Sequence, residues 1–131
     1  MDFSVVDSHG SQYENGHVSF ESFSSLGIKD SYARLKPDLD IKKIKVNLRR
    51  LDTILATHAP NVGHIDILSV DVEGWELEVL DGLDLKKYAP RVMVIENLFN
   101  DGQYRQHLST KGYSLSTFLY PNDVYVRNDL K

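Results

Sequence analysis

The sequence lacks cysteine altogether. This absence excludes disulfide bridges, thiolate metal ligands and a cysteine nucleophile, and it suits the cytosol, so we expect a cytoplasmic protein. The sequence also has no run of about 18 apolar residues and no charged-then-apolar leader, so it predicts neither a membrane span nor a signal peptide. We therefore expect no membrane partner.

An excess of positive charge is lacking as well. The 15 Lys and Arg residues are outnumbered by 19 Asp and Glu residues, which gives a formal net charge of -4 and a pI near 5.7. A chain with this balance has no general attraction for nucleic acid phosphates. We therefore expect no nucleic acid partner.

The chain does have the composition of a folded domain. Of its 131 residues, 41% are hydrophobic and 26% are charged, values close to the average for soluble globular proteins. The length allows one core but is short for a complete doubly wound nucleotide-binding domain. We expect a single, incomplete domain over residues 1–131, with an irregular segment at 1–45 and a regular core at 46–131.

The regular core alternates helices and strands. Apolar residues spaced three and four positions apart predict helices, and continuous apolar runs predict strands that are buried on both faces of a parallel sheet. The expected helices cover residues 51–58, 75–83 and 102–111. The expected strands cover residues 65–72, 91–95, 113–120 and 123–127. Because Pro121-Asn122 separates the last two strands, the predicted fold class is α/β, with a mostly parallel sheet that ends in an antiparallel C-terminal hairpin.

Polar side chains stand where the first two expected strands end. Asp71 and Glu73 come at the end of the strand at 65–72, and Glu96 and Asn97 follow the strand at 91–95. In open parallel sheets, ligands bind outside the carboxyl ends of the strands. A carboxylate at that position can remove a proton from a reacting hydroxyl. Asp71, Glu73 and Glu96 are therefore the candidate catalytic residues.

These side chains also fit two other roles. Asp71, Glu96 and Asn97 offer the hard oxygen ligands that a magnesium-like ion prefers, so they form a candidate metal site. Asp71 or Glu73 can instead cap the helix that begins near Trp75, where carboxylates stabilise the free N–H groups. The sequence leaves catalysis, metal binding and capping open.

The helix that follows Gly74 carries one aromatic residue and several acidic ones. Trp75 and Val79 are four positions apart, and this helical spacing favours packing in the core over stacking on a ligand. The acidic residues are expected on a solvated helix face. They are Glu76, Glu78, Asp81 and Asp84.

Three motifs, in this order, resemble the FkbM family of methyltransferases. They are Leu-Asp-Thr-Ile-Leu at residues 51–55, Asp-Val-Glu-Gly at 71–74 and Gly-Tyr at 112–113. The similarity covers roughly residues 46–127, and the block 66–82 is its most specific part. It implies a Rossmann-like class I methyltransferase sheet, S-adenosylmethionine as the methyl donor, and a hydroxyl oxygen on a sugar, polyketide or other small molecule as the acceptor.

The same resemblance places Asp71, Val72 and Glu73 against the cofactor and makes a small-molecule or glycan acceptor the expected partner. The sequence departs from the family in one respect. The glycine-rich strand-to-helix turn that would hold the cofactor is not visible in residues 1–45, where Asp7-Ser8-His9-Gly10 lacks the paired glycines. We therefore expect the N-terminal part of the methyltransferase domain to be missing.

Two other functions stay open. A non-catalytic fragment or interaction module would keep the fold, and its exposed strand edge would favour self-association. The Asp71-Val72-Glu73 triplet also resembles the Asp-x-Asp of metal-dependent phosphoryl and glycosyl transferases. Two differences disfavour that alternative. Glu73 stands where the pattern has the shorter Asp, and Trp75 stands where the phosphoryl-transfer pattern has Thr or Val.

Overall fold

The computed structural model describes residues 1–7, 24–34 and 40–131. They form two compact units. The first contains Met1–Leu48 and the turn Glu73–Trp75, and the second contains Arg49–Val72 and Glu76–Lys131. Each unit is described by itself. Ser8, His9 and Gly10 of the cofactor-loop candidate lie outside the described residues.

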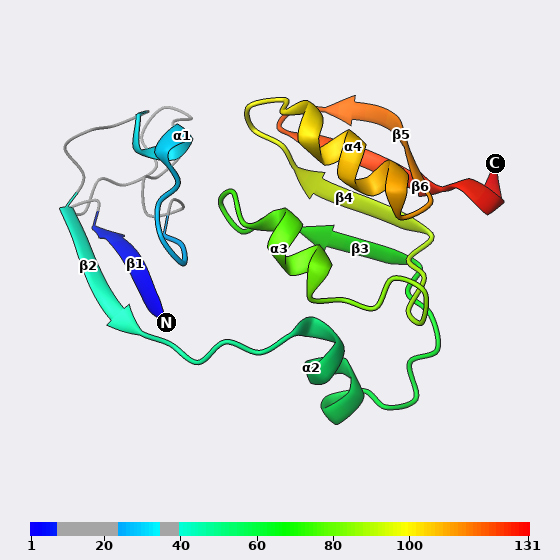
Figure 1. The fold of residues 1–131 in the computed structure, drawn as a ribbon, viewed down its shortest axis with the longest axis horizontal. Helices are drawn as coiled ribbons and strands as arrows, with labels where there is room; N and C mark the ends of the chain where they lie inside the picture. Colours follow the sequence, from blue (N-terminus) through cyan, green and yellow to red (C-terminus); the bar gives the residue numbers. More distant parts are fainter. Residues whose placement is uncertain (8–23, 35–39) are drawn as a thin grey trace. The chain divides into compact units, whose positions relative to one another are not determined.

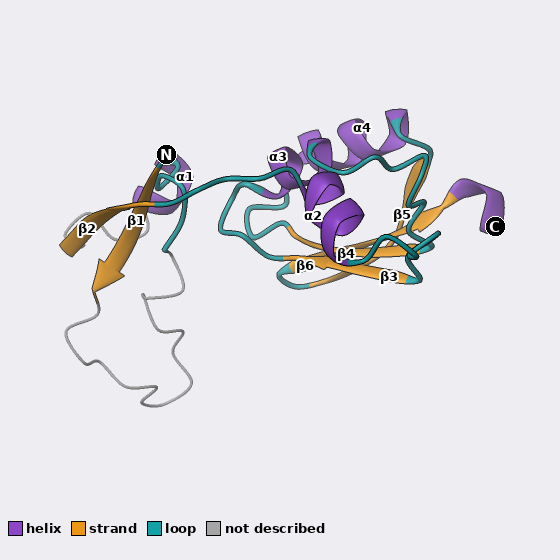
Figure 2. Ribbon diagram, turned by 90° about the horizontal axis from the view of Figure 1, so that it is seen from below, coloured by secondary structure: helices purple, strands orange, loops and turns teal. Residues whose placement is uncertain are grey.

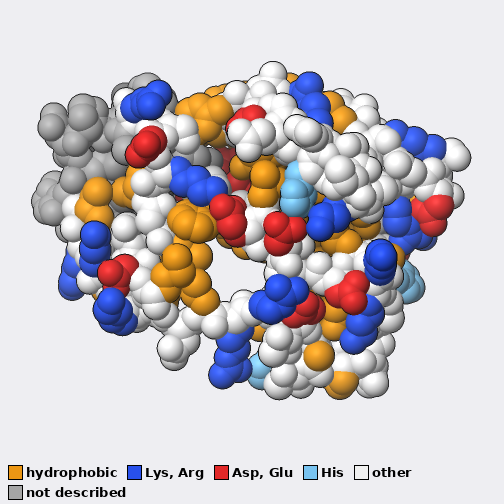
Figure 3. Space-filling view, viewed as in Figure 1, with side chains coloured by type: hydrophobic (Ala, Val, Ile, Leu, Met, Phe, Trp, Pro, Cys, Tyr) orange, Lys and Arg blue, Asp and Glu red, His pale blue; other side chains and the backbone are white. Residues whose placement is uncertain are grey.

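The first unit contains an antiparallel pair of strands (Figure 1). β1 (Asp2–Asp7) pairs with β2 (Asp40–Lys45), and α1 (Asp30–Ala33) is a single helical turn. The sequence predicts only the first of these strands, because lysine occupies half of β2 and hides its alternation. Figure 3 shows Lys and Arg side chains over the β2 part of the surface.

Trp75 belongs to the first unit and not to a helix. Its indole Nε1–H donates to the backbone oxygen of Gly27 at 2.9 Å, and the ammonium of Lys29 lies 4.7 Å from the ring centroid. The prediction that Trp75 packs through helical spacing is therefore wrong. The physical reason is the backbone turn at Glu73 and Gly74, which delays the start of the helix to Glu76.

The second unit carries most of the regular structure predicted from the sequence. Its helices are α2 (Leu51–His58), α3 (Glu76–Asp81), α4 (Gly102–Thr110) and the 3₁₀ turn η2 (Asn128–Leu130). Its strands are β3 (Ile67–Val70), β4 (Val92–Glu96), β5 (Tyr113–Leu119) and β6 (Asn122–Arg127). The predicted order of helices and strands is confirmed, and the bounds shift by a few residues.

The four strands of this unit form one sheet in the order β3-β4-β6-β5. β3 and β4 are parallel, whereas β6 runs antiparallel to both β4 and β5. The predicted C-terminal hairpin is confirmed. β3, β4 and β5 run in the same direction, and β6, which lies between β4 and β5, is the one antiparallel strand of this sheet, so the predicted mostly parallel sheet with an antiparallel hairpin is confirmed for these four strands.

Three helices of the second unit, α2, α3 and α4, lie on one face of the sheet (Figure 2). Alternate residues of the strands point to that face and pack with α3 and α4. The buried core consists of Val70, Leu80, Met93, Ile95, Leu108, Tyr113 and Tyr125. Burial of this set is the main stabilising contribution within the unit.

β3 is an edge strand of this sheet. Ile67 is 68% exposed, and Ser69 is exposed as well. The prediction that both faces of this strand are buried is therefore wrong. In the second unit, helices cover one face of the sheet only, so residues that alternate toward the other face stay accessible.

Candidate functional site

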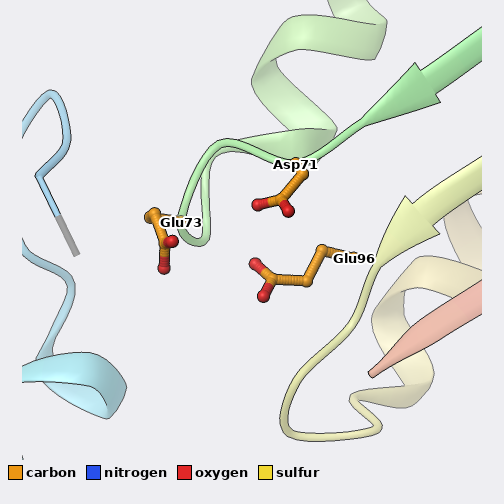
Figure 4. Close-up of side chains that lie close together, drawn as sticks. All are labelled: Asp71, Glu73 and Glu96. Carbon is orange, nitrogen blue, oxygen red and sulfur yellow. The ribbon is translucent and has the colours of Figure 1, made fainter. Parts of the chain in front are cut away.

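The register of the parallel strands brings two of the predicted site residues together. Val70 pairs with Ile95, so Asp71 and Glu96, the residues that follow these two, both stand at the carboxyl ends of β3 and β4. The arrowheads of both strands point to the same end of the sheet (Figure 1). Asp71 is exposed, whereas Glu96 is 8% exposed. The two carboxylates face one another (Figure 4).

Glu73 follows in the turn that leads from β3 to α3. One carboxylate oxygen from each of Asp71, Glu73 and Glu96 lies within 4.8 Å of the others. Glu73 has φ 58° and Gly74 has φ 90°, so both adopt the left-handed backbone region. That conformation costs roughly 1–2 kcal/mol for a residue with a side chain. A strained acidic residue in a turn beside other carboxylates is typical of a functional site.

A buried carboxylate follows this turn in the sequence, at the start of α3. Glu76 is 0% exposed; its Oε1 accepts the backbone N–H of Val72 at 3.1 Å, and its Oε2 accepts the hydroxyl of Tyr104 at 2.6 Å. The prediction of a solvated position for Glu76 is wrong. Glu76 shares the buried side of α3 with Leu80, four positions along, and its charge is satisfied by hydrogen bonds rather than by water.

The surroundings of Asp71 change its acidity. Although Asp71 is exposed as a residue, neighbouring atoms keep part of the water away from its carboxyl group, which raises its pKa, and the negative charge of Glu76 raises the pKa further. Burial also raises the pKa of Tyr104, and its hydrogen bond to Glu76 adds to that shift, so the phenol remains a proton donor to the carboxylate. A carboxylate with a raised pKa binds a proton more readily than an ordinary Asp, which suits a general base.

Asn97 does not join this carboxylate group. Its Nδ2 donates to Asp123 Oδ2 at 2.9 Å and to the backbone oxygen of Asp101 at 3.1 Å, while its Oδ1 accepts the backbone N–H of Asp101 at 2.7 Å. The side chain is 2% exposed. The hydroxyl of Tyr125 completes the group by donating to Asp123 at 2.7 Å. Through these hydrogen bonds the amide of Asn97 stabilises the loop between β4 and α4. Of the three predicted metal ligands, only Asp71 and Glu96 therefore lie close together.

Sequence reasoning missed Glu76 and Tyr104 as supports of the site. A signal for Glu76 was present: it precedes Leu80 and Leu83 by four and seven positions, the spacing of one helix face. Nothing comparable marked Tyr104, which lies within the predicted helix at 102–111. The pairing of the two depends on how α3 and α4 lie on the sheet.

Comparisons with known proteins agree with the motifs. A family model described as the methyltransferase FkbM domain matches residues 4–115. Methyltransferase sdnD of Sordaria araneosa is 36% identical over 84 residues, a region that covers 56% of this chain and 32% of sdnD. The chain thus spans about a third of the length of this curated relative. No solved structure matches the chain.

The family match begins much nearer the N-terminus than the region 46–127, in which the motifs were recognised. In the described part of the chain, every helix is too short or too polar to cross a bilayer.

Proposed function

Because this chain belongs to the FkbM methyltransferase family, we propose that it takes part in S-adenosylmethionine-dependent methyl transfer to a hydroxyl oxygen of a small molecule or sugar. The family supports an enzyme of the methyltransferase type. The observation that carries the finer proposal is the proximity of the Asp71 and Glu96 carboxylates at the carboxyl ends of two parallel strands. We also propose that the four-stranded sheet is part of a Rossmann-like class I methyltransferase sheet.

The carboxylates act on the acceptor in this proposal. When bound, S-adenosylmethionine supplies an electrophilic methyl group on a cationic sulfur. Asp71 accepts the proton of the acceptor hydroxyl, and its raised pKa brings it closer to the working pH. Glu96 accepts a second hydrogen bond from the acceptor or orients its hydroxyl. Positioned proton removal of this kind contributes about 10² to 10⁴-fold to a reaction rate.

The described residues fit the acceptor side of methyl transfer better than the cofactor side. The ranges 1–7, 24–34 and 40–131 contain no glycine-rich turn between a parallel strand and a helix. β1, which ends at Asp7, the first residue of the Asp7-Ser8-His9-Gly10 candidate, is antiparallel to its neighbour β2. The backbone N–H of Val72 is taken by Glu76, so a contact of Val72 with the cofactor would use its side chain or carbonyl. Cofactor contacts by Asp71, Val72 and Glu73 therefore stay a prediction.

A divalent ion is the alternative role for the same carboxylates. Asp71, Glu73 and Glu96 supply hard oxygen atoms of the kind that Mg²⁺ prefers. Such an ion would lower the pKa of a bound hydroxyl without a protein base. Loss of activity on chelation that Mg²⁺ restores would favour the ion, whereas activity unchanged by chelation would leave Asp71 as the base.

Isothermal titration with S-adenosylmethionine and S-adenosylhomocysteine tests the proposal. We expect binding to the chain, and transfer of labelled methyl groups to a hydroxyl acceptor that falls at least 10²-fold in Asp71→Asn. Asp66→Asn is the matched control, since Asp66 lies at the other end of β3, outside the carboxylate group. If neither molecule binds and no acceptor is methylated, the methyltransferase proposal is wrong for this chain.

A non-catalytic interaction module is the second candidate. The exposed Ile67 at the free edge of β3 favours it, because an uncovered strand edge can pair with another chain. Sedimentation velocity measures this directly. A dimer that Ile67→Lys returns to monomer, together with absent cofactor binding, would favour the module over the enzyme.

A further inference from the structure

An exposed apolar cluster lies at the same end of the sheet as the carboxylate pair. It comprises Phe118, Leu119 and Tyr120 at the tip of the β5–β6 hairpin and Phe99 in the β4–α4 loop. Their exposed fractions are 40%, 62%, 71% and 44%. The arrowheads of β3, β4 and β5 all point to this end (Figure 1). Large apolar side chains gathered at one exposed edge indicate a binding surface more often than scattered ones do.

The strand register connects this cluster to the carboxylates. Glu96 pairs with Asn122, and Asn122 pairs with Leu119, so these three residues follow one another across β4, β6 and β5, and the carboxylate of Asp71 lies close to that of Glu96. Adjacent strands lie about 4.8 Å apart, which places the backbone of Leu119 roughly 10 Å from that of Glu96. Along this row, the side chains change from acidic at Glu96 to apolar at Leu119. The distance between the two positions is about the length of a small molecule that contains one or two rings.

Two further contacts hold the apolar cluster in place. The backbone N–H of Asn97 donates to the carbonyl of Pro121 at 2.9 Å, which joins the β4–α4 loop to the hairpin turn. The rings of Phe118 and Tyr120 meet edge to face, with centroids 6.2 Å apart. This geometry is a favourable one for aromatic pairs. The cluster is thus ordered against the strand that carries Glu96.

We propose that the hairpin tip binds the body of the acceptor, and that the acceptor is a flat, apolar, ring-containing alcohol or phenol rather than a sugar. In this proposal the hydroxyl of the acceptor contacts the carboxylates of Asp71 and Glu96. The ring system of the acceptor packs on Leu119 and Tyr120. This inference rests on the proposed methyltransferase function and names the acceptor class. A free sugar has little apolar surface to bury against these side chains, so it should bind them more weakly than an apolar ring system.

NMR titration of the isotope-labelled full chain with 2-naphthol tests the inference. We expect amide shifts at residues 96–97 and 118–120, and weaker binding of 2-methoxynaphthalene, which cannot donate a proton to the carboxylates. Tyr120→Ser should weaken 2-naphthol binding roughly 2- to 10-fold, the effect of one lost aromatic contact. Ile67→Ser is the matched control, because Ile67 is 68% exposed on the same sheet at the start of β3. Methyl β-D-glucopyranoside should leave the spectrum unchanged.

Four results would overturn the inference. The first two are no binding of 2-naphthol, and equal 2-naphthol affinity of the Tyr120→Ser and Ile67→Ser variants. The other two are binding of the glucoside as tight as that of 2-naphthol, and amide signals of residues 118–120 that shift with protein concentration alone. The last result would show that a second copy of the chain occupies the tip. A parallel titration with S-adenosylmethionine separates the two claims. Specific 2-naphthol binding without cofactor binding would keep the apolar site and refute the methyltransferase function.

Discussion

The substitution Tyr104→Phe removes a single hydroxyl group, but it should lower the free energy of unfolding of the second unit substantially. The hydroxyl donates to Glu76 at 2.6 Å, and Glu76 is fully buried. A hydrogen bond to a charged group contributes about 1.5–3 kcal/mol, and a buried carboxylate that loses a donor keeps its desolvation cost. Since Tyr104 is itself half-buried and water can partly replace the hydroxyl, we expect the lower part of that range, about 1.5–2 kcal/mol.

Urea unfolding followed by circular dichroism measures this change. With a slope of about 2 kcal/mol per molar urea, the midpoint should fall by roughly 1 M. Tyr120→Phe is the control, because Tyr120 is 71% exposed and its variant should stay within about 0.5 kcal/mol of the parent. Glu76→Gln keeps an acceptor for Val72 and should show a coupling energy with Tyr104→Phe of at least about 0.5 kcal/mol. A Tyr104→Phe midpoint equal to that of the control would refute the reasoning.

Three more changes follow from the same geometry. Asp71→Asn removes a carboxylate that faces Glu96 and has a raised pKa, so it should stabilise the chain at pH 7 while methyl transfer falls. The sign follows from linkage: the parent loses stability as pH rises from the ordinary Asp range through the raised pKa, and thermal unfolding from pH 3 to 7 should show no such loss in the variant. Glu73→Gly should raise the free energy of unfolding by roughly 1 kcal/mol, because glycine adopts φ 58° without strain; an unchanged melting temperature would count against it. Asp101→Ala removes the side chain that accepts the Gln103 N–H at the start of α4 and should cost about 1 kcal/mol, whereas Asp101→Asn should cost much less in the same melt.

The hydrogen bond between the buried carboxylate of Glu76 and Tyr104 was not predictable from the sequence. Glu76 was expected in solvent together with Glu78 because both are acidic, although the spacing of Glu76 with Leu80 and Leu83 places it on the apolar face of the helix. Its burial depends on Tyr104, which lies 28 positions along the chain and on another helix. Only the packing of both helices on one sheet face brings the two side chains together.

The strand order was equally beyond local patterns. Apolar runs predict that strands form, and the hairpin at residues 113–127 follows from its turn, but neither pattern says which strand pairs with β4. The structure places β6 there, which makes two of the pairings antiparallel and sets Leu119 in one row with Glu96. Long-range pairing depends on how the strands twist and pack as a set, and no short segment contains that information.

The sequence by itself determined the helices and strands of residues 51–127 to within a few positions, the FkbM family, and the position of Asp71 and Glu96 at strand ends. Those features depend on short-range properties: apolar periodicity, turn residues and the spacing of motifs. The tertiary structure decided that these carboxylates face one another, that Asn97 donates instead to Asp123, and that Glu76 accepts hydrogen bonds from Val72 and Tyr104. These outcomes depend on contacts between segments far apart in the chain, because burial and hydrogen bonding there are set by packing and not by neighbours in sequence.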